Sequence, residues 1–173
     1  MKFKAFTSAT LATTRESWRR DVIQSDGFLP DVEQQLDWAE KHVVLTDDEI
    51  AYGIFTDDGD DAVGICELCI TRQSIHSKWV KFLRLRLRPS IDEQLFDHKK
   101  EGITAALEAY IACVIGVFDI KNQHKASIIK VYGRTQQQVS FLTLLSASLE
   151  KRDKITFESS IEGRWLVLNW KKS

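Results

Sequence analysis

Hydrophobic positions along the chain repeat with two different spacings, and the changes between them mark the expected elements. Apolar residues three and four apart predict four helices, and alternating apolar residues predict seven strands. The helices are expected at 9–24, 31–42, 102–118 and 136–150, and the strands at 2–7, 50–56, 62–72, 79–88, 127–132, 155–159 and 165–170. This order of elements indicates a mixed α/β protein folded as a single domain over residues 1–173.

The same spacing predicts the inward face of each helix. In the first helix these residues are Leu11, Trp18 and Val22, and in the second they are Val32, Leu36 and Ala39. The helix at 102–118 is apolar nearly all round, which is typical of a well-buried helix. Its inward residues are expected to be the larger ones, namely Ile103, Leu107, Tyr110, Ile111, Val114 and Phe118.

The connection between the strand at 79–88 and the helix at 102–118 has the composition of an anion-binding site. It reads as a polar loop that ends in Lys99-Lys100 and places Gly102 at the start of the helix. Backbone N–H groups at a helix N-terminus have no acceptor within the helix, and the helix dipole favours negative charge there. Glycine lets a phosphate approach the backbone closely. The alternative is an ordinary helix start with both lysines in solvent.

The order of elements resembles that of the Gcn5-related N-acetyltransferase (GNAT) superfamily over nearly the whole chain. In that family the fourth strand ends in a hydrophobic–x–Pro step, which Leu87-Arg88-Pro89 matches. The next loop has the pattern Gln/Arg-x-x-Gly-x-Gly/Ala, and the aligned residues here run from Lys99 to Thr104, with Gly102 as the retained glycine. The resemblance implies a central, mixed, mostly antiparallel sheet of about six to seven strands, with about four helices and with its fourth and fifth strands splayed apart at a bulge.

The resemblance also implies an acetyl-coenzyme A (acetyl-CoA) site. The cofactor's pyrophosphate would lie on the segment formed by Lys99, Lys100, Glu101, Gly102, Ile103 and Thr104. Strand amides at Leu85 and Leu87 would hold the pantetheine arm and polarise the thioester carbonyl. The implied activity is that of an acyl-CoA-dependent N-acyltransferase, which moves an acetyl group from acetyl-CoA to a primary amine by direct attack.

Such a reaction needs a base for the attacking amine and a proton donor for the leaving thiolate. Glu67 lies amid apolar residues of the strand at 62–72 and is the candidate catalytic base, because burial would raise its pKa. Alternatively, Glu67 pairs with an arginine across the sheet. The tyrosine that many family members use as the donor aligns with Leu142, which cannot donate a proton. The alternative function is therefore a catalytically inactive GNAT-like binding or regulatory module.

Two further patterns carry possible chemistry. Arg84, Arg86 and Arg88 alternate along one strand, so they are expected on one face, either solvated, in ion pairs, or holding carboxylates or phosphates. Cys66 and Cys69 have the spacing of a redox or zinc motif, but they lie inside a predicted strand and no second pair completes a tetrahedral site. We expect these cysteines to be structural, and we expect no metal site.

Charge is unevenly distributed, although the net charge of the 173 residues is only −1. Residues 26–62 contain twelve acidic residues and a single basic one, which favours electrostatic steering of a cationic acceptor, either a small-molecule or a peptide amine. A sheet that binds nucleic acid through the arginine row is a third interpretation. The pI near 6.4 argues against it, so no nucleic-acid partner is expected.

Cysteine count and hydropathy bear on where the protein acts. Three cysteines, an odd number, argue against a disulfide framework and favour a reducing compartment. No apolar run of about 18 residues without charge is evident, so no membrane partner is expected. The sequence thus predicts a cytoplasmic protein. The last strand, with Trp165 and Trp170, leaves a homodimer open.

Overall fold

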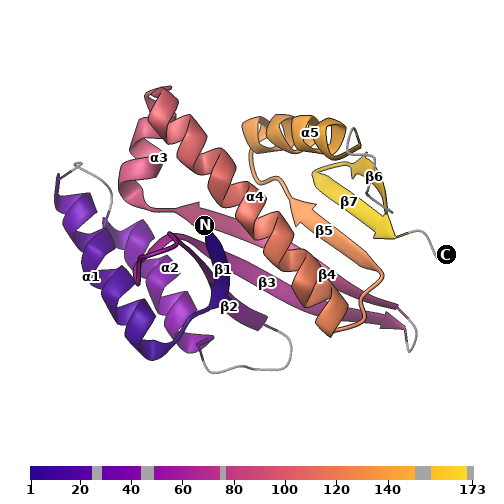
Figure 1. The fold of residues 1–173 in the computed structure, drawn as a ribbon, viewed down its shortest axis with the longest axis horizontal. Helices are drawn as coiled ribbons and strands as arrows, with labels where there is room; N and C mark the ends of the chain where they lie inside the picture. The colour runs from indigo at the N-terminus through magenta and orange to yellow at the C-terminus, as the bar shows by residue number, and fades with distance from the viewer. Residues whose placement is uncertain (25–28, 44–48, 75–76, 151–156, 171–173) are drawn as a thin grey trace. The chain divides into compact units, whose positions relative to one another are not determined.

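A computed structural model describes residues 1–24, 29–43, 49–74, 77–150 and 157–170 of the chain (Figure 1). Within these residues the strands and helices follow the predicted order, with one additional helix. The elements are β1 (Lys2–Ala5), α1 (Ser8–Gln24), α2 (Leu29–Lys41), β2 (Glu49–Phe55), β3 (Ala62–Ser74), β4 (Ser77–Leu87), α3 (Pro89–Phe96), α4 (Lys100–Gln123), β5 (Ile128–Tyr132), α5 (Gln136–Glu150), β6 (Phe157–Glu162) and β7 (Trp165–Trp170).

The strands form one seven-stranded sheet with the order β1-β2-β3-β4-β5-β7-β6. β4 and β5 are parallel, whereas the β1–β2, β5–β7 and β6–β7 pairs are antiparallel. The predicted mixed, mostly antiparallel sheet is therefore confirmed. The chain divides into two compact units: unit 1 comprises 1–67 and 85–116, and unit 2 comprises 68–84 and 117–173. The single domain over 1–173 stays a prediction.

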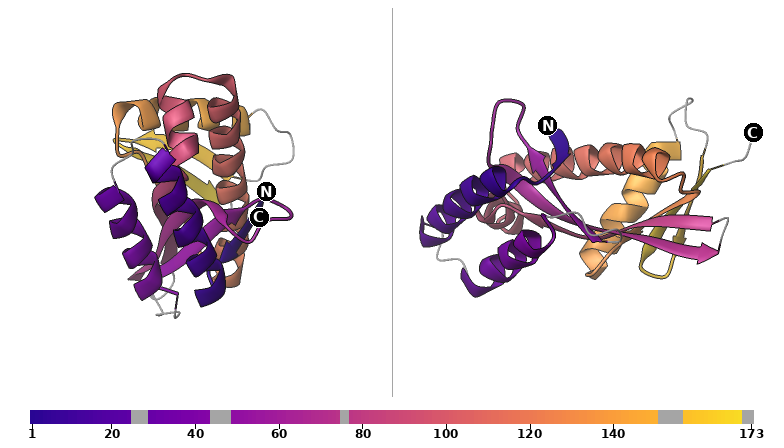
Figure 2. Two further views of the ribbon diagram at one scale, coloured as in Figure 1. Left: turned by 90° about the vertical axis from the view of Figure 1, so that its left-hand side faces the viewer. Right: turned by 90° about the horizontal axis from the view of Figure 1, so that it is seen from below.

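Unit 1 is built around α1 and α2, which lie side by side in both views of Figure 2. All six residues predicted to face inward from these helices are buried. Trp18 is fully buried, and its indole Nε1 donates a hydrogen bond to the Ala62 carbonyl at 2.7 Å. Thr14 of α1 contacts the same residue, since the Ala62 amide donates a hydrogen bond to the Thr14 Oγ1 at 2.9 Å. These two bonds fix α1 to the start of β3.

Unit 2 contains a hairpin formed by β6 and β7. Glu162 and Trp165 are register partners, so the loop has two residues, Gly163 and Arg164. Gly163 has φ +62°, as expected for a primed turn with glycine at its first central position. The strand predicted over 155–159 thus extends to Glu162, and its first two positions, 155–156, lie outside the described residues.

The polar loop expected between β4 and α4 is wrong, because most of it forms α3. Pro89 occupies the first turn, where its fixed φ suits a helix and its missing N–H costs nothing. Arg88 before it is extended, with ψ 138°, as residues before proline prefer. Only Asp97, His98 and Lys99 separate α3 from α4, and His98 takes a positive φ of 55° to make the turn.

The predicted inward face of α4 is also wrong for its large aliphatic residues. Ile103 and Leu107 are each 39% exposed and Ile111 is 43% exposed. The buried side instead carries small residues, among them Ala106, Ala109 and Cys113. Small side chains allow a helix to approach the sheet closely. At Gly116, for example, a Cβ atom would lie 2.1 Å from the Phe3 ring.

By length and composition α4 could cross a membrane, and it is the one such helix among the described residues. Its small-residue side packs inside unit 1, as in the core helix of a folded domain: Cys113 contacts Cys66 of β3, and Gly116 lies against Phe3 of β1.

β4 changes the side it buries near its middle. Val80 and Phe82 are buried, Leu83 and Arg84 are both half-buried, and then Leu85 and Leu87 are buried. This shift of the alternation by one residue is the mark of a β-bulge. The register with β5 runs from Trp79↔Ile128 to Phe82↔Val131, whereas β4 continues to Leu87. The splayed β4/β5 pair is therefore confirmed.

Candidate functional site

Arg88 ties three elements of unit 1 together where β4 passes into α3. Its Nε and Nη2 donate to the two carboxylate oxygens of Asp21 on α1, at 2.6 and 3.0 Å, and its Nη1 donates to Asp61 at 2.9 Å. Ser90 donates to Asp21 at 2.6 Å, and Ser17 donates to Asp61 at 2.7 Å. A two-pronged arginine–carboxylate contact of this kind holds its partners in a fixed orientation. The start of α3 is therefore anchored to α1.

The charges in this network support one another. Burial by itself would raise the pKa of Asp21, but the hydrogen bonds from Arg88 and Ser90 outweigh it, and the net pKa is lowered. The hydrogen bond with Asp21 raises the pKa of the Arg88 guanidinium against the opposing effect of burial. Arg88 is thus an ion-paired residue with a structural role, and it is not available to hold an external anion.

A second group of ionisable residues lies beside this network, also in unit 1. Arg86 Nε is 3.6 Å from the Asp92 carboxylate on α3 and has no hydrogen-bond partner among the described residues. Burial raises the pKa of Asp92 to about 6, despite the opposing effect of Arg86. Burial also raises the pKa of Tyr110 on α4, and the charge of Asp92 adds to that rise. Carboxyl groups whose pKa is shifted toward neutral pH are typical of functional sites.

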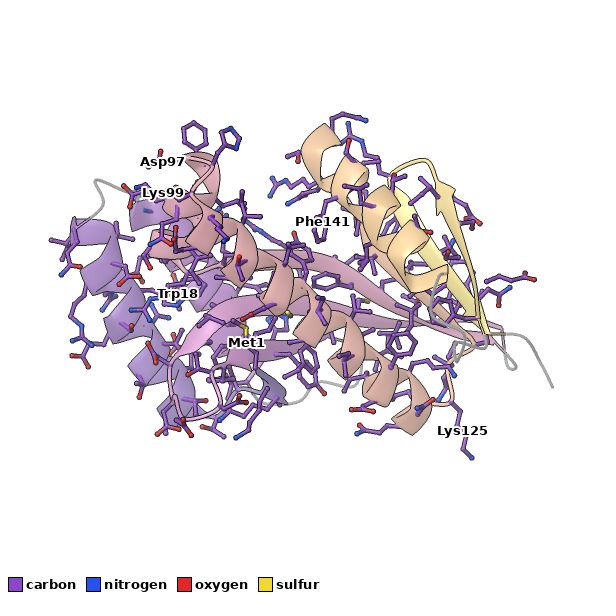
Figure 3. All side chains as sticks on the ribbon, turned by 45° about the horizontal axis from the view of Figure 1, so that its top comes forward. Met1, Trp18, Asp97, Lys99, Lys125 and Phe141 are labelled. Carbon is purple, nitrogen blue, oxygen red and sulfur yellow. The ribbon has the colours of Figure 1, made fainter. Side chains whose placement is uncertain are left out.

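The turn between α3 and α4 presents the predicted phosphate-binding residues. Asp97 and Lys99 are labelled there in Figure 3, and the Lys99 ammonium lies 3.0 Å from the Asp97 carboxylate. The Lys99 amide donates to Gln94 and the Ile103 amide donates to Lys99, so both amides are already used. The first-turn amides of Lys100, Glu101 and Gly102 have no acceptor within the helix. These three amides are the ones that could bind an anion.

Gly102 is required by packing between α3 and α4. It is buried, and a Cβ atom at this position would lie 2.5 Å from the Gln94 carbonyl carbon and 2.6 Å from the Leu95 nitrogen. Both atoms belong to the backbone of α3, which cannot yield as a flexible side chain would. A ligand at the α4 N-terminus would therefore approach from the Lys100–Glu101 side, because α3 covers the Gly102 side.

The other predicted site residues fall at different depths. Leu85 and Leu87 are buried, and their side chains lie against Gly64 of β3. Lys99, Lys100, Glu101, Ile103 and Thr104 are exposed. Glu67 is half-buried on β3 and has interactions within the protein. These residues all belong to unit 1, and their roles stay predictions.

Leu142, which aligns with the family's tyrosine, is a core residue with 2% exposure, so it places no proton donor in that slot. Tyr132 instead packs against Trp165 in unit 2, with ring centroids 4.7 Å apart.

The two cysteines of the predicted motif differ in burial. Cys66 and Cys113 are both buried, and their sulfur atoms lie 3.1 Å apart between β3 and α4. Cys69 is half-buried. Burial raises the pKa of the Cys66 thiol, which disfavours the reactive thiolate form. The close pair is thus Cys66 with Cys113, which no sequence spacing indicated.

Part of the acidic segment 26–62 is neutralised within unit 1. Arg15 lies 2.7 Å from Glu33, 2.9 Å from Asp37 and 3.0 Å from Glu40, and Arg19 also contacts Glu33. Asp61 is held by Arg88. The predicted electrostatic steering did not allow for these arginines of α1.

No family model matches the chain, and no curated protein matches it in sequence. Solved structures do match. The crystal structure of a probable acetyltransferase aligns with 94% of this chain and 97% of its own, at a TM-score of 0.54 and 14% identity. The chain has a GNAT-like fold. A GNAT-family structure from Desulfovibrio desulfuricans covers 96% of this chain and 95% of its own, with a TM-score of 0.46 and 11% identity.

A third similar structure is the KacTA–DNA complex, with a TM-score of 0.46, 14% identity, and coverage of 80% of this chain and 79% of its own. A complex of a similar chain with DNA contradicts the partner prediction, which named a cationic amine acceptor and excluded nucleic acid. That prediction was wrong. Arg15, Arg19 and Arg88 also neutralise part of the acidic segment on which that prediction relied.

Asp92 is a candidate residue that the sequence pattern does not indicate. Its surroundings depend on α3, whereas the sequence pattern predicts a loop over 89–100. The available signal was Pro89 followed by Asp92, because proline at the first position and an acid in the first turn are typical of a helix start.

Proposed function

We propose that the protein binds acetyl-CoA through unit 1 and transfers its acetyl group to an acceptor by direct attack. The observation that carries this proposal is the direction of the backbone amides of β4 beyond its bulge. The Arg88 amide donates to Val63 of β3 at 2.9 Å. Because successive N–H groups of a strand point to opposite edges, the amides of Leu87 and Leu85 point away from β3. They also lie past the last β5 partner, so they are the groups that would hold the pantetheine arm and the thioester.

The pyrophosphate would lie on the amides of Lys100, Glu101 and Gly102. Two positive side chains, Lys99 and Lys100, stand beside two negative ones, Asp97 and Glu101, so the side chains around this turn nearly cancel. Attraction for a phosphate therefore rests on the aligned amides and the dipole of α4, a helix of 24 residues. Gly102 would serve the site indirectly. Because it has no side chain, α3 can pack closely against the α4 N-terminus and fix its position.

Two carboxylates are candidates for the base. Glu67, on β3, is the one that the sequence indicates. Asp92 is the one that the structure adds, and its pKa of about 6 suits proton transfer near neutral pH. In the reaction the acceptor attacks the thioester carbon, the carbon–sulfur bond breaks, and coenzyme A leaves as a thiolate. The base takes the acceptor's proton and releases it to solvent, and the thiolate takes a proton from solvent, because Leu142 has none to donate.

Thermal unfolding in the presence of acetyl-CoA tests the binding step. A ligand at 100 times its Kd stabilises the folded protein by about 2.7 kcal/mol, which corresponds to roughly 5–10 °C for a chain of this size. The double variant Lys99→Gln/Lys100→Gln should weaken the shift only modestly, and Lys125→Gln, an exposed lysine of unit 2, is the matched control. No shift at millimolar acetyl-CoA would rule the proposal out.

The choice of base is tested by measuring the coenzyme A thiol that is released from acetyl-CoA. Water, which is present in every assay, serves as the acceptor of the acetyl group. If Asp92 is the base, Asp92→Asn removes the rise in rate centred near pH 6, whereas Glu67→Gln leaves that rise in place. If Glu67→Gln abolishes thiol release at every pH whereas Asp92→Asn retains it, the base is Glu67. The inactive binding module is the second candidate function, favoured by the burial of Leu142, and it predicts a thermal shift without any thiol release.

A further inference from the structure

The two compact units carry opposite charges. Unit 2 contains fourteen Lys and Arg residues and five Asp and Glu residues, whereas unit 1 contains ten and twenty. Their net charges are therefore +9 and −10, which together give the −1 of the whole chain. The pI near 6.4 is an average over these two units and says nothing of either. Unit 2 by itself has the charge expected of a domain that binds a polyanion.

One face of the unit 2 sheet gathers aromatic rings and lysines. Lys81 of β4 and Lys130 of β5 are register partners, and so are Tyr132 of β5 and Trp165 of β7. The Lys130 Nζ lies 4.3 Å from the centroid of the Trp79 ring, and the Lys81 Nζ lies 5.7 Å from it. The rings of Tyr132 and Trp165 are 4.7 Å apart. Side chains that contact one another across three neighbouring strands share one face of the sheet.

The opposite face of these strands forms the core of unit 2. The residues that alternate with the aromatic set are buried, namely Val80, Phe82, Ile129, Val131, Leu166 and Leu168. α5 packs on that side, because Ser146 of α5 is hydrogen-bonded to Ser159 of β6 at 2.7 Å, and Ser159 is the register partner of Leu168. The face with the rings is therefore the one that points away from α5, and its rings are half-buried.

We propose that this face binds a single-stranded nucleic acid. Bases stack on Trp79, Tyr132 and Trp165, while Lys81 and Lys130 neutralise phosphates. Aromatic side chains on a positively charged sheet are the usual means of holding unpaired bases, because every base has a face that can stack. Trp79 is level with Ile128, four residues before Tyr132, so the stacking positions are spread over about 13 Å along the strands. That length accommodates more than one base.

Glu162 sets the strength of this interaction. Its carboxylate lies 3.4 Å from the Lys130 ammonium, so in the free protein that charge is partly satisfied. Glu162 is exposed on β6, and its exchange for glutamine leaves the size of the side chain unchanged. Glu162→Gln should therefore tighten binding, a result that a merely structural role for Lys130 does not predict.

Fluorescence anisotropy with a labelled, mixed-sequence single-stranded oligonucleotide tests the proposal. The logarithm of the affinity should fall linearly with the logarithm of salt concentration, and Lys81→Gln/Lys130→Gln should reduce that slope by about 1.4, near 0.7 for each phosphate that is no longer neutralised. The matched control is Lys2→Gln/Lys4→Gln, which removes the same charge from two exposed positions of unit 1 and should leave the slope unchanged. Equal decreases in affinity for the two double variants would overturn the proposal.

The rings are tested separately from the charges. Trp165→Ala should weaken binding about tenfold, while Trp165→Phe keeps a ring and most of the affinity. Circular dichroism spectra identify any variant that has not folded. If Trp165→Ala has not folded, the affinity of Trp165→Phe is the test. No binding at about 50 mM salt would refute the proposal. So would binding that duplex DNA matches and that neither Trp165 variant alters, since that pattern describes a nonspecific polyanion surface.

Discussion

Gly102→Ala separates two roles for this glycine that the sequence alone cannot distinguish. As part of a phosphate site, glycine serves the ligand, and alanine would impair binding without affecting the fold. As the contact between α3 and α4, glycine serves the fold. The added Cβ would lie 2.5 Å from the Gln94 carbonyl carbon, where ordinary contacts begin at 3.4 Å, so α3 must move by about 0.9 Å.

The magnitude follows from two opposing effects. Overpacking against a backbone that cannot yield typically costs about 1–3 kcal/mol, and the closeness of two α3 backbone atoms places this case at the upper end. Alanine regains up to about 1 kcal/mol of helix propensity. The expected net decrease is about 2 kcal/mol of the free energy of unfolding, or roughly 4–8 °C in Tm.

Urea unfolding followed by circular dichroism measures this change, and Thr104→Ala is the matched control. Thr104 is exposed two residues further along α4, so alanine there should be neutral or slightly stabilising. A Gly102→Ala protein at least as stable as the wild type would refute the packing argument. If that stable protein also showed no acetyl-CoA thermal shift, the glycine would serve the ligand alone.

Three further predictions concern single residues elsewhere. Gly163→Ala should cost about 1 kcal/mol in urea unfolding, purely through the backbone, because φ is +62° and no described atom lies within 4 Å of the new Cβ; an unchanged midpoint would contradict this. Asp21→Asn should destabilise the protein by about 2–3 kcal/mol at pH 7. Because the pKa of Asp21 is lowered in the fold, that contribution is present above the ordinary carboxyl value near 4 and vanishes as the pH falls through the folded value, so wild type and variant should converge in acid. Thiol labelling of the native protein should leave Cys66 and Cys113 unmodified until denaturant is added, and three equal native labelling rates would show that these two are not buried.

The sequence predicted the buried faces of those helices whose apolar residues all lie on one side. In α1 and α2 the apolar residues form one stripe, and Trp18 and Leu36 are buried as the stripe requires. α4 has no such stripe because it is apolar nearly all round. Its buried side is chosen by side-chain size, since Ala109 and Gly116 permit a close approach that Ile111 would prevent.

The candidate site was less accessible to prediction because its properties arise from neighbours distant in sequence. Arg88 was expected to be solvated or ion-paired, but its partners Asp21 and Asp61 lie 67 and 27 residues away. Asp92 acquires its raised pKa only once α3 has formed beside Arg86. A helix of eight residues leaves too little periodicity to be recognised when three of them are Asp, Glu or Gln.

The division of the chain between units 1 and 2 runs through the interior of three elements. β3 passes from one unit to the other after Glu67, β4 after Arg84 and α4 after Gly116. None of these three crossings is a linker at which a protease could separate the halves, and any truncation designed to isolate one of them cuts a strand or a helix. Expression of either half alone is expected to yield insoluble chain. A division at the exposed Gly163–Arg164 turn leaves every strand and helix whole. Two fragments divided there and co-expressed are expected to reassemble more readily.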